Sequence, residues 1–410
     1  MKYVIIGNSA AAVGCVEGIR QVDPAGGIAM ISSEPYHTYS RPLISYLLYG
    51  KTDEERMKYR PDSFYEDNGC TTYFGRTVER IEPEVKKVVL ADGETIGYDK
   101  LLVATGSSPF VPPMPGLEQV KNKFSFMSLD DAKALERAIG PESRVLIVGA
   151  GLIGLKCAEG IADRVKHIQV VDLADRILPS ILDADGSQMV KEHIEKHNVE
   201  FFLSDSVARF EAETAHLKSG AELPFDVLVV AVGVRPNTHL VSEIGGKTGR
   251  GIVTDVRCAT SLPDIYAAGD CAESADVVSG ENRVLALLPN AYMQGECAGI
   301  NMAGGKARYD KAMAMNAIGF FGLHVITAGN YDGEAVVEQS EKAYKKLIVK
   351  DGFLNGYILI GNVERAGIYT ALIRERTPLS TIDFDLIKEK PQLMAFSKRE
   401  RAKTLGGVRV

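Results

Sequence analysis

Hydrophobic and polar positions along the chain follow one order twice. Each of two segments begins with a β-branched apolar run, passes through a turn of small residues into a helix-like stretch, and closes with a second apolar run before an acidic residue. The first spans residues 3–34 and the second residues 144–172. This order is typical of a strand–helix–strand unit with parallel strands. The sequence therefore predicts two Rossmann-like units.

Further apolar runs predict the rest of the architecture. KKVVL (86–90) and YDKLLVATG (98–106) predict a hairpin that returns to the first sheet, and the proline-rich VPPMPG (111–116) predicts a linker. FDVLVVAVGVRPN (225–237) and DIYAAGDCAES (264–274) each read as a strand that stops at a glycine turn. From about residue 311 the pattern changes to alternating strands and one helix, which predicts a small α+β domain.

The predicted fold class is α/β, with two Rossmann-like nucleotide-binding domains and a C-terminal α+β domain. The first domain is expected to be discontinuous, because the strand at 264–274 is predicted to re-enter it. The predicted boundaries are 1–115 with 246–310, then 116–245, 311–385 and a basic tail at 386–410. In its last twenty residues the tail holds five basic side chains and one acid, a net charge of +4 from Lys398, Arg399, Arg401, Lys403, Arg409 and Glu400.

Composition narrows the function classes. The 410 residues are 45% hydrophobic and 25% charged, with a net charge of −7, which argues against nucleic-acid binding because phosphate recognition relies on clustered Lys and Arg. No apolar run approaches the ~20 residues of a membrane span. The apolar N-terminus is better explained by a strand entering a glycine turn than by a signal peptide. Six scattered cysteines without a CxxC spacing favour a reducing cytoplasm.

VLIVGAGLIG places three glycines, Gly149, Gly151 and Gly154, directly after an apolar strand and at the start of a helix. The first glycine permits the tight turn, the second lets a pyrophosphate approach the backbone, and the third lets helix and strand pack closely. Asp172 follows Gly149 by 23 residues (172 − 149) and is placed to accept from a ribose 2′-hydroxyl. A carboxylate there repels a 2′-phosphate, so the site is predicted to prefer NAD over NADP.

The first unit carries a degenerate version of this motif, GNSAAA, which keeps Gly7 but places Ser9 and Ala12 in the other two slots. Small residues still allow close backbone approach, and the Ser9 hydroxyl is an additional donor, so a dinucleotide site is predicted here too. Glu34 is the candidate for holding the adenosine ribose, with Ser33 as the alternative. An exposed turn acid before a proline is the other interpretation of Glu34.

Four stretches, ATGSSPFVPPMPG, VLIVGAGLIGLKCAE, VVAVGVRPNT and IYAAGDCAES, together resemble the signatures of the FAD-dependent pyridine nucleotide-disulfide oxidoreductase superfamily over residues 1 to about 375. The resemblance implies FAD at the first site and NAD at the second. It implies that the turn at 104–106 closes over the FAD crevice, that Asp270 binds the ribityl-phosphate region, and that Gly233 lines the nicotinamide nucleotide. It also implies that a helix starting at 288–295 directs its N-terminus at the flavin, where its dipole favours negative charge.

The residues expected at FAD are Gly7, Ser9, Ala10, Ala11, Ser33, Glu34, Arg41, Pro42, Val78, Ala104, Thr105, Gly106, Gly269, Asp270 and Pro289. The residues expected at NAD are Gly149, Gly151, Leu152, Ile153, Gly154, Asp172 and Gly233. No metal site is predicted.

The chain departs from the disulfide reductases at YHTYSRPLISYLLYG (36–50), because residues 35–60 contain no cysteine. The stretch is similar to the YxRPxLS segment of rubredoxin reductases, oxygenase-coupled ferredoxin reductases and the flavin part of nitrite reductases. That resemblance implies that Arg41 neutralises the FAD pyrophosphate and that Pro42 lies beside the flavin ring. Tyr46 stands where ferredoxin reductases usually carry a lysine.

Lys156 is a second departure, because many relatives have a glutamate close to the nicotinamide at this position. Lys156, Tyr46 and Pro42 are therefore candidates for tuning the flavin. For Lys156 the candidate roles are stabilising the reduced flavin and pairing with a neighbouring acid, against the alternative of a partly solvated helix lysine.

The sequence thus predicts an enzyme that exchanges a hydride between NADH and FAD and single electrons with an external iron–sulfur protein, of ferredoxin or rubredoxin type. No catalytic acid or base is expected, because hydride transfer is the chemistry of the cofactors themselves. An NADH oxidase that forms peroxide and a non-catalytic flavoprotein whose nucleotide binding controls association are the alternatives. The basic tail is either a docking segment for an acidic partner or a solvated tail. A homodimer is left open.

Overall fold

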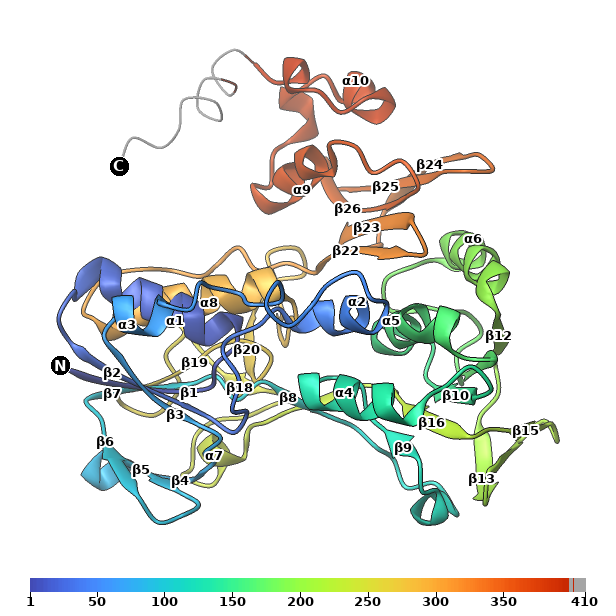
Figure 1. Ribbon diagram of the computed structural model, residues 1–410. Helices are drawn as coiled ribbons and strands as arrows, with labels where there is room; N and C mark the ends of the chain where they lie inside the picture. The colour runs from blue at the N-terminus through green and yellow to red at the C-terminus, as the bar shows by residue number, and fades with distance from the viewer. Residues whose placement is uncertain (398–400, 402–410) are drawn as a thin grey trace.

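The computed structural model describes residues 1–397 and 401. It shows three bodies, one built from the N-terminal segment with a later return, one from the middle of the chain, and one C-terminal (Figure 1). Among the described residues, no helix combines the length and the apolar character that crossing a membrane requires. Four of the five basic residues in the last twenty positions, Lys398, Arg399, Lys403 and Arg409, lie outside the described residues.

The first body is organised around a five-stranded parallel sheet in the order β19-β7-β1-β2-β3. Its central strands are apolar at nearly every position, because both faces of the sheet are covered. The return of the chain supplies β19 as an edge strand beside β7. The elements of this layer are β1 (Lys2–Ile6), α1 (Ala10–Val22), β2 (Gly27–Ser32), α2 (Ile44–Leu48), α3 (Phe64–Asp67), β3 (Cys70–Phe74), β7 (Lys100–Val103), β19 (Ile265–Ala267) and α8 (Leu288–Met302).

The two faces of this sheet are covered differently. Helices α1 and α8 pack on one face, and an antiparallel sheet of β4 (Val78–Glu82), β5 (Lys87–Leu90) and β6 (Thr95–Gly97) packs on the other. The predicted hairpin between KKVVL and YDKLLVATG is therefore wrong. KKVVL is β5 of the small sheet, whereas β7 pairs in parallel with β1. A strand with both faces buried is stabilised inside the parallel sheet, and sequence adjacency does not override that burial.

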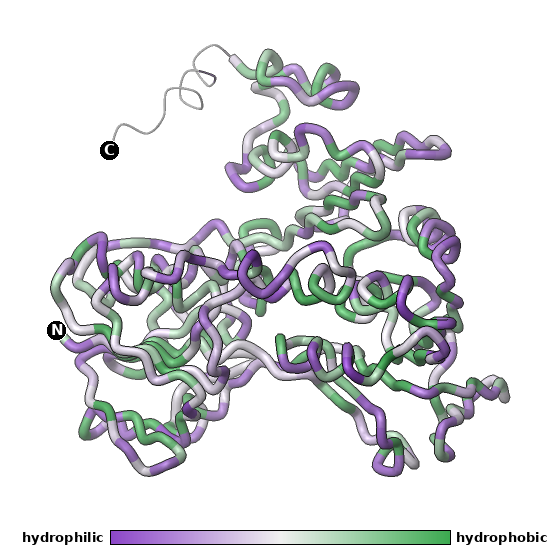
Figure 2. Tube along the Cα trace, in the orientation of Figure 1, coloured by the Kyte–Doolittle hydropathy of each residue, from purple (hydrophilic) through white to green (hydrophobic). Residues whose placement is uncertain are grey.

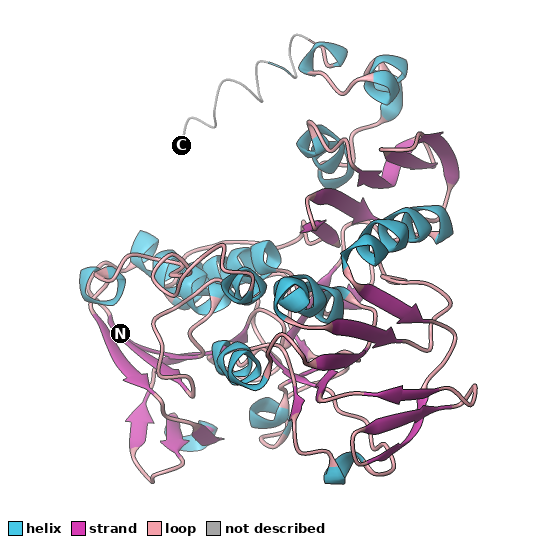
Figure 3. Cartoon of the chain, turned by 45° about the vertical axis from the view of Figure 1, so that its right-hand side comes forward, coloured by secondary structure: helices cyan, strands magenta, loops and turns pink. Residues whose placement is uncertain are grey.

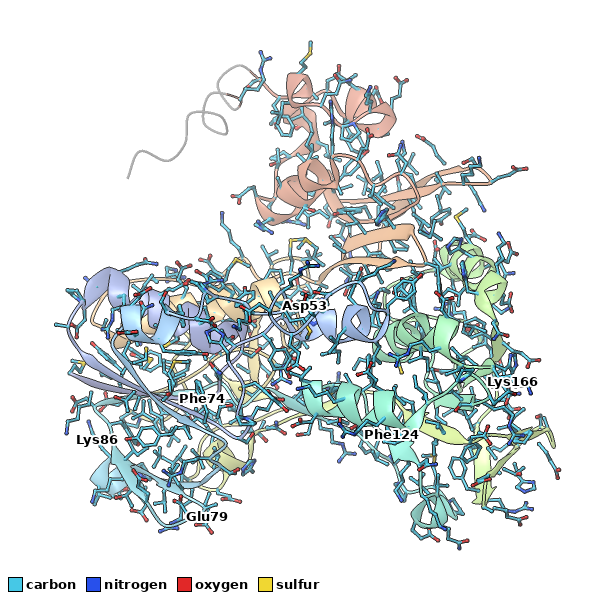
Figure 4. All side chains as sticks on the ribbon, in the orientation of Figure 1. Asp53, Phe74, Glu79, Lys86, Phe124 and Lys166 are labelled. Atoms are coloured by element: carbon cyan, nitrogen blue, oxygen red, sulfur yellow. The ribbon has the colours of Figure 1, made fainter. Side chains whose placement is uncertain are left out.

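The second body repeats the design with the parallel order β12-β11-β10-β16-β9. Helices α4, α5 and α6 cover one face, and an antiparallel sheet of β13, β14 and β15 covers the other. Phe124, labelled in Figure 4, lies on the edge strand. The bounds are β9 (Lys123–Phe124), α4 (Leu129–Ala138), β10 (Arg144–Val148), α5 (Leu152–Ile161), β11 (His167–Val171), α6 (Ala184–Ile194), β12 (Val199–Phe202), β13 (Val207–Glu211), β14 (Thr214–Leu217), β15 (Glu222–Pro224) and β16 (Val227–Val230).

Short elements connect the bodies. The two crossings between the first and second bodies pair with each other as β8 (Ser107–Pro109) and β17 (Val234–Pro236), antiparallel. The return segment also contains α7 (His239–Ser242), β18 (Ile252–Val253), β20 (Ala272–Ala275) and β21 (Asn282–Arg283). Hydrophobic positions concentrate in the strands of the two parallel sheets (Figure 2).

The C-terminal body is an antiparallel sheet in the order β22-β23-β26-β25-β24. One face packs against helices α9 and α10, and the other lies on the second body. Figure 3 shows this sheet above the second body. Within the segment predicted as a tail, Ile387 and Ala395 are buried against this sheet's helix layer. The bounds are β22 (Met315–Phe320), β23 (Leu323–Gly329), β24 (Glu334–Gln339), β25 (Tyr344–Lys350), β26 (Phe353–Ile360), α9 (Ala366–Arg374) and α10 (Phe384–Glu389).

Candidate functional site

The degenerate turn after β1 has the geometry of a phosphate-binding turn. Gly7 adopts φ +131°, and a Cβ built on it would lie 2.3 Å from the carbonyl oxygen of Ala104. No other residue type fits this position without moving the backbone that follows β7. Ser9 is the N-cap of α1, and its hydroxyl makes no capping hydrogen bond. The first N–H groups of α1 and the Ser9 hydroxyl are thus available to an anion.

A cavity of about 620 Å³ opens at this turn, along the carboxyl ends of β1, β2 and β7. Its volume and mixed polar and apolar lining fit a dinucleotide such as FAD. Fourteen of the fifteen residues predicted for FAD line it: Gly7, Ser9, Ala10, Ala11, Ser33, Glu34, Arg41, Pro42, Val78, Ala104, Thr105, Gly106, Gly269 and Asp270. Residues more than 200 positions apart in the sequence therefore meet in one cavity.

Pro289 is the exception. It lies in the first turn of α8 and is exposed, whereas Leu288 and Ala291 of the same helix line the cavity. The α8 N-terminus does reach the cavity, but Pro289 does not face it. Along a helix, neighbouring residues point about 100° apart, so the motif position alone did not determine which side chain faces the cavity.

Glu34 and Arg41 lie on the same wall and pair with each other. The Arg41 guanidinium donates to Glu34 through Nη2 and Oε2 at 2.6 Å, and to the Met127 carbonyl oxygen at 3.4 Å. The Tyr39 hydroxyl donates to Glu34 at 3.1 Å and accepts from the Leu129 backbone N–H at 3.0 Å. Glu34 is therefore not a free turn acid. It is an oriented carboxylate at the end of β2, with a cation beside it.

Two other turns that line the cavity are held by residues that the sequence did not single out. The Asn237 side-chain amide donates to the Thr105 carbonyl oxygen at 2.9 Å. The Thr105 hydroxyl in turn donates to the backbone carbonyl oxygen of Asn237 at 2.7 Å. Gln294, 2% exposed on α8, accepts from the Gly269 N–H at 2.6 Å. Burial raises the pKa of the Asp270 carboxyl, and the Arg41 guanidinium opposes that rise. Asn237 belongs to VRPNT, part of one of the stretches that resemble the family, so the sequence could have indicated it as a site residue. No motif around Gln294 indicates its role.

The glycine turn of the second body reproduces the first closely. Gly149 adopts φ +118°, and a Cβ built on it would lie 2.3 Å from the carbonyl oxygen of Ala231. The amide of Gly149 donates to the Val171 carbonyl oxygen at 2.8 Å, as that of Gly7 donates to Ile31 at 2.8 Å. Gly154 packs against the turn itself, since its Cβ would lie 2.1 Å from the Gly149 oxygen. This turn, with Leu152 and Ile153 beginning α5, fits a second dinucleotide.

Asp172 lies at the end of β11, next to that turn. Its carboxylate accepts from the Ala150 N–H at 2.6 Å and from the Ala174 N–H at 2.8 Å. Each carboxylate oxygen retains a lone pair, so the group can still accept from a ribose hydroxyl. The adjacent Leu173 side chain is 73% exposed, an apolar surface that sequence reasoning did not select. Gly233, at φ +119°, follows the neighbouring strand β16.

Tyr46 and Lys156 are brought together although they are 110 positions apart (156 − 46). The Lys156 ammonium lies 4.5 Å from the centre of the Tyr46 ring and forms an ion pair with Glu159. Of the alternatives for Lys156, the structure therefore shows pairing with a neighbouring acid. Neither residue lines the cavity, whereas Pro42 does.

None of the six cysteines, all within the described residues, forms a disulfide. None of them lines the cavity. Cys271 follows the cavity residue Asp270 but is fully buried, and burial raises the pKa of its thiol. The cavity therefore has no thiolate with which to exchange disulfides.

Comparison with known proteins agrees with this geometry. Residues 1–295 match the family described as pyridine nucleotide-disulphide oxidoreductase, and residues 315–377 match the rubredoxin NAD+ reductase C-terminal domain. The chain is 30% identical over 394 residues to the epsilon subunit of NADH-dependent phenylglyoxylate dehydrogenase of Aromatoleum evansii, covering 93% of each protein. It is 29% identical to rubredoxin-NAD(+) reductase of Pseudomonas putida, covering 74% of this chain and 80% of that protein.

Among solved structures, the covalent putidaredoxin reductase–putidaredoxin complex contains a chain of the same fold. Its TM-score is 0.87 at 23% identity, with 95% of this chain and 96% of that chain covered. The predicted α/β fold class is confirmed. Some relatives are longer, and the chain spans 49% of the assimilatory nitrate reductase electron transfer subunit of Bacillus subtilis.

Proposed function

The chain belongs to the pyridine nucleotide-disulphide oxidoreductase family, and from this premise we propose that it exchanges a hydride between NADH and FAD and single electrons with an iron–sulfur protein. The predicted family resemblance is confirmed, and with it an oxidoreductase that uses FAD and a nicotinamide nucleotide. FAD supplies the chemistry when bound, because it takes up two electrons together and releases them one at a time. The residues of this chain bind and orient the two nucleotides.

The roles of individual residues follow from their positions. The turns at Gly7 and Gly149 admit pyrophosphate to the backbone, and the helices after them favour its negative charge. Glu34 and Asp172, at the ends of corresponding strands, are the proposed ribose acceptors. Arg41, which reaches the cavity beside Glu34, offsets the charge of the FAD pyrophosphate. The α8 N-terminus favours negative charge on the flavin.

The observation that carries the choice of electron partner is the absence of a cysteine from the cavity lining. Without a thiol beside the flavin, electrons leave to a second protein. The rubredoxin reductase C-terminal family match at residues 315–377 favours an iron–sulfur protein as that partner. The similarity to a dehydrogenase subunit over almost the whole chain favours, as a second form of the same function, a partner that is another subunit of a larger enzyme. The free thiols fit the cytoplasmic location that we also propose.

The test is rapid-mixing spectroscopy on the purified chain with its FAD. We expect NADH to bleach the flavin absorbance faster than NADPH does, and rubredoxin or ferredoxin to restore it faster than air-saturated buffer. Bleaching too slow to support turnover would contradict an enzymatic role and favour a flavoprotein that only binds nucleotides. Restoration by oxygen as fast as by either iron–sulfur protein would favour a peroxide-forming oxidase. Sedimentation of the same sample tests for a homodimer.

A further inference from the structure

Three elements from different parts of the chain meet beside the two nucleotide sites. Helix α2 continues directly from the turn Arg41–Leu43, whose Arg41 and Pro42 line the cavity, and helix α5 continues from the glycine turn at Gly149. The two helices lie against each other, below the β22–β23 hairpin (Figure 1). Gly160 of α5 allows this close approach because it has no side chain: a Cβ there would lie only 2.8 Å from the Ser45 carbonyl oxygen of α2. This junction therefore joins the helix that follows the cavity wall to the helix that follows the second glycine turn.

Lys156 is the residue that contacts all three elements. Its ammonium pairs with Glu159 one turn along α5, donates to the Gly319 carbonyl oxygen of β22 at 3.1 Å, and lies over the Tyr46 ring of α2 at 4.5 Å. The Lys156 side chain is only 17% exposed and that of Glu159 only 7%. An ion pair between a lysine and an acid at the surface contributes little to stability. A buried ion pair strongly constrains the groups around it, because breaking it leaves a buried charge without a partner.

Glu159 extends the link to the backbone of the C-terminal hairpin. Its Oε1 accepts from the Phe321 N–H at 2.7 Å. Phe321 adopts φ +48° and stacks its ring on His197 with centroids 4.0 Å apart, and its carbonyl lies 3.2 Å from Nε2 of His193. Besides the apolar contacts of its buried face, the hairpin is thus linked to the second body through Lys156, Glu159 and two histidines. A strained backbone position of this kind persists only where its surroundings hold it.

We propose that Lys156, held by Glu159, is a positioning residue for hydride transfer. It sets the helix that begins at the NAD glycine turn against the helix that follows the FAD cavity wall, and it anchors both to the C-terminal hairpin. The inference rests on the proposed function, because it concerns the distance between the two nucleotides that function requires. Its consequence is specific: loss of Lys156 misplaces the nicotinamide relative to the flavin while the nucleotide still binds.

The variants separate charge from packing. Lys156→Met alone leaves Glu159 buried without a cation, so the double variant Lys156→Met with Glu159→Gln removes both charges and keeps an acceptor for the Phe321 N–H. Lys156→Arg keeps the cation. Lys191→Met is the matched control. Lys191 lies on α6, away from α2, and it also pairs with a nearby glutamate, Glu195. Its ammonium lies 5.9 Å from the centre of an aromatic ring, that of Phe201.

Three quantities are measured on FAD-loaded protein: the limiting rate of flavin bleaching by NADH, the Kd for NAD⁺ by calorimetry, and the change that NAD⁺ causes in the visible absorbance of the oxidised flavin. In the double variant we expect the limiting rate to fall about tenfold or more, since small misplacements are costly in hydride transfer. We expect Kd to stay within about threefold of the wild type and the absorbance change to lose about half its amplitude or more. Lys156→Arg is expected to recover most of both losses.

A wild-type limiting rate in the double variant, an equal loss in Lys191→Met, or a loss confined to Kd would each overturn the inference. If NADH fails to bleach the wild-type flavin, the proposed function itself fails. The absorbance change caused by NAD⁺ still decides the inference in that case, because an unaltered change in the double variant shows that Lys156 does not position the nucleotide.

Discussion

Single residues decide how each nucleotide site is built. The turns at Gly7 and Gly149 share a positive φ and the same close approach to a neighbouring strand end, although only the second keeps the three-glycine motif. Ala12 takes the third slot of the first turn and is fully buried. The first glycine is therefore the residue that both turns require, and the other two slots tolerate small side chains.

Replacing Gly149 by alanine tests this at the second site. The new methyl group would lie 2.3 Å from the Ala231 carbonyl oxygen at a φ that alanine disfavours, so we expect the free energy of unfolding to fall by about 1–3 kcal/mol. NAD⁺ affinity is expected to fall at least about tenfold, with FAD content unchanged. Urea unfolding and calorimetric titration measure both. Gly140→Ala, where a Cβ meets open space, serves as the control, and wild-type NAD⁺ affinity in Gly149→Ala would refute the assignment.

Asp172→Asn tests the choice of nucleotide. The substitution keeps an acceptor oxygen for one of the two backbone amides that donate to Asp172, and it removes the charge that repels a 2′-phosphate. We expect the ratio of kcat/KM for NADH over NADPH, with flavin bleaching as the readout, to fall about tenfold, equivalent to about 1.4 kcal/mol. Asp175→Asn, at a nearby acid whose side chain is 72% exposed, is expected to leave the ratio unchanged. A ratio that responds equally to both substitutions would argue against a contact with Asp172.

At the scale of elements, α1 and α8 pack backbone to backbone. Gly14 and Gly18 of α1 lie against Tyr292 and Glu296, and Gly295 and Gly299 of α8 lie against the α1 backbone. Each helix thus carries two glycines four positions apart on the contact face, which allows the axes to approach closely. The N-termini of both helices reach the same cavity. The spacing is visible in the sequence, but which helices it joins is not.

Gly295→Ala tests that packing. A Cβ at Gly295 would lie 1.9 Å from the Ala11 carbonyl oxygen, so the helices must separate, and we expect a loss of about 1–3 kcal/mol in stability. Because Ala11 and Ala291 line the cavity, FAD content after purification is expected to drop as well. The control is Gly367→Ala in α9, where nothing lies within 4 Å of a Cβ; there alanine is expected to stabilise by up to about 1 kcal/mol. Equal effects of the two substitutions would contradict close packing.

At the scale of the whole molecule, the C-terminal sheet is joined to the second body by polar links as well as by the apolar core. Asp183 caps α6 by accepting from the Gly186 N–H at 3.0 Å, and it also accepts from the Tyr344 hydroxyl at 2.6 Å and the Lys346 ammonium at 2.7 Å. Burial alone would raise the pKa of this carboxyl, but the hydrogen bonds from Lys346, Tyr344 and Gly186 outweigh it, and the pKa is lowered.

The pH dependence follows from that lowered pKa. The stabilisation by Asp183 is present above the unfolded-state pKa of about 3.9 and is lost as the pH falls through the lower folded-state value. Asp183→Asn keeps the helix cap but removes the charge, so we expect it to lower the free energy of unfolding by about 1–3 kcal/mol at pH 7. The gap from the wild type should narrow progressively as the pH falls below about 4. Denaturant titrations from pH 7 to pH 3 measure it.

Asp385→Asn is the control for this prediction, because Asp385 pairs with Lys388 at a side-chain exposure of 91%. Its substitution should change stability by less than about 0.5 kcal/mol at any pH. A gap for Asp183→Asn that does not depend on pH would show that the charge of Asp183 does not hold the two bodies together.

The sequence by itself determined the features that are encoded locally. Strand and helix periodicity, the glycine turns at 7 and 149, the acid that ends each unit and the lack of a cysteine at 35–60 are all properties of short stretches. The resemblance of four such stretches to a known family then implied most of the residues that line the cavity. Tertiary structure alone decided which sheet β5 and β7 join, that Pro289 turns away from the cavity, that Gln294 holds the Gly269 turn, and that Lys156 meets Tyr46 and Glu159. These depend on burial and on contacts between residues far apart in the chain, and such contacts leave no periodic trace in the sequence.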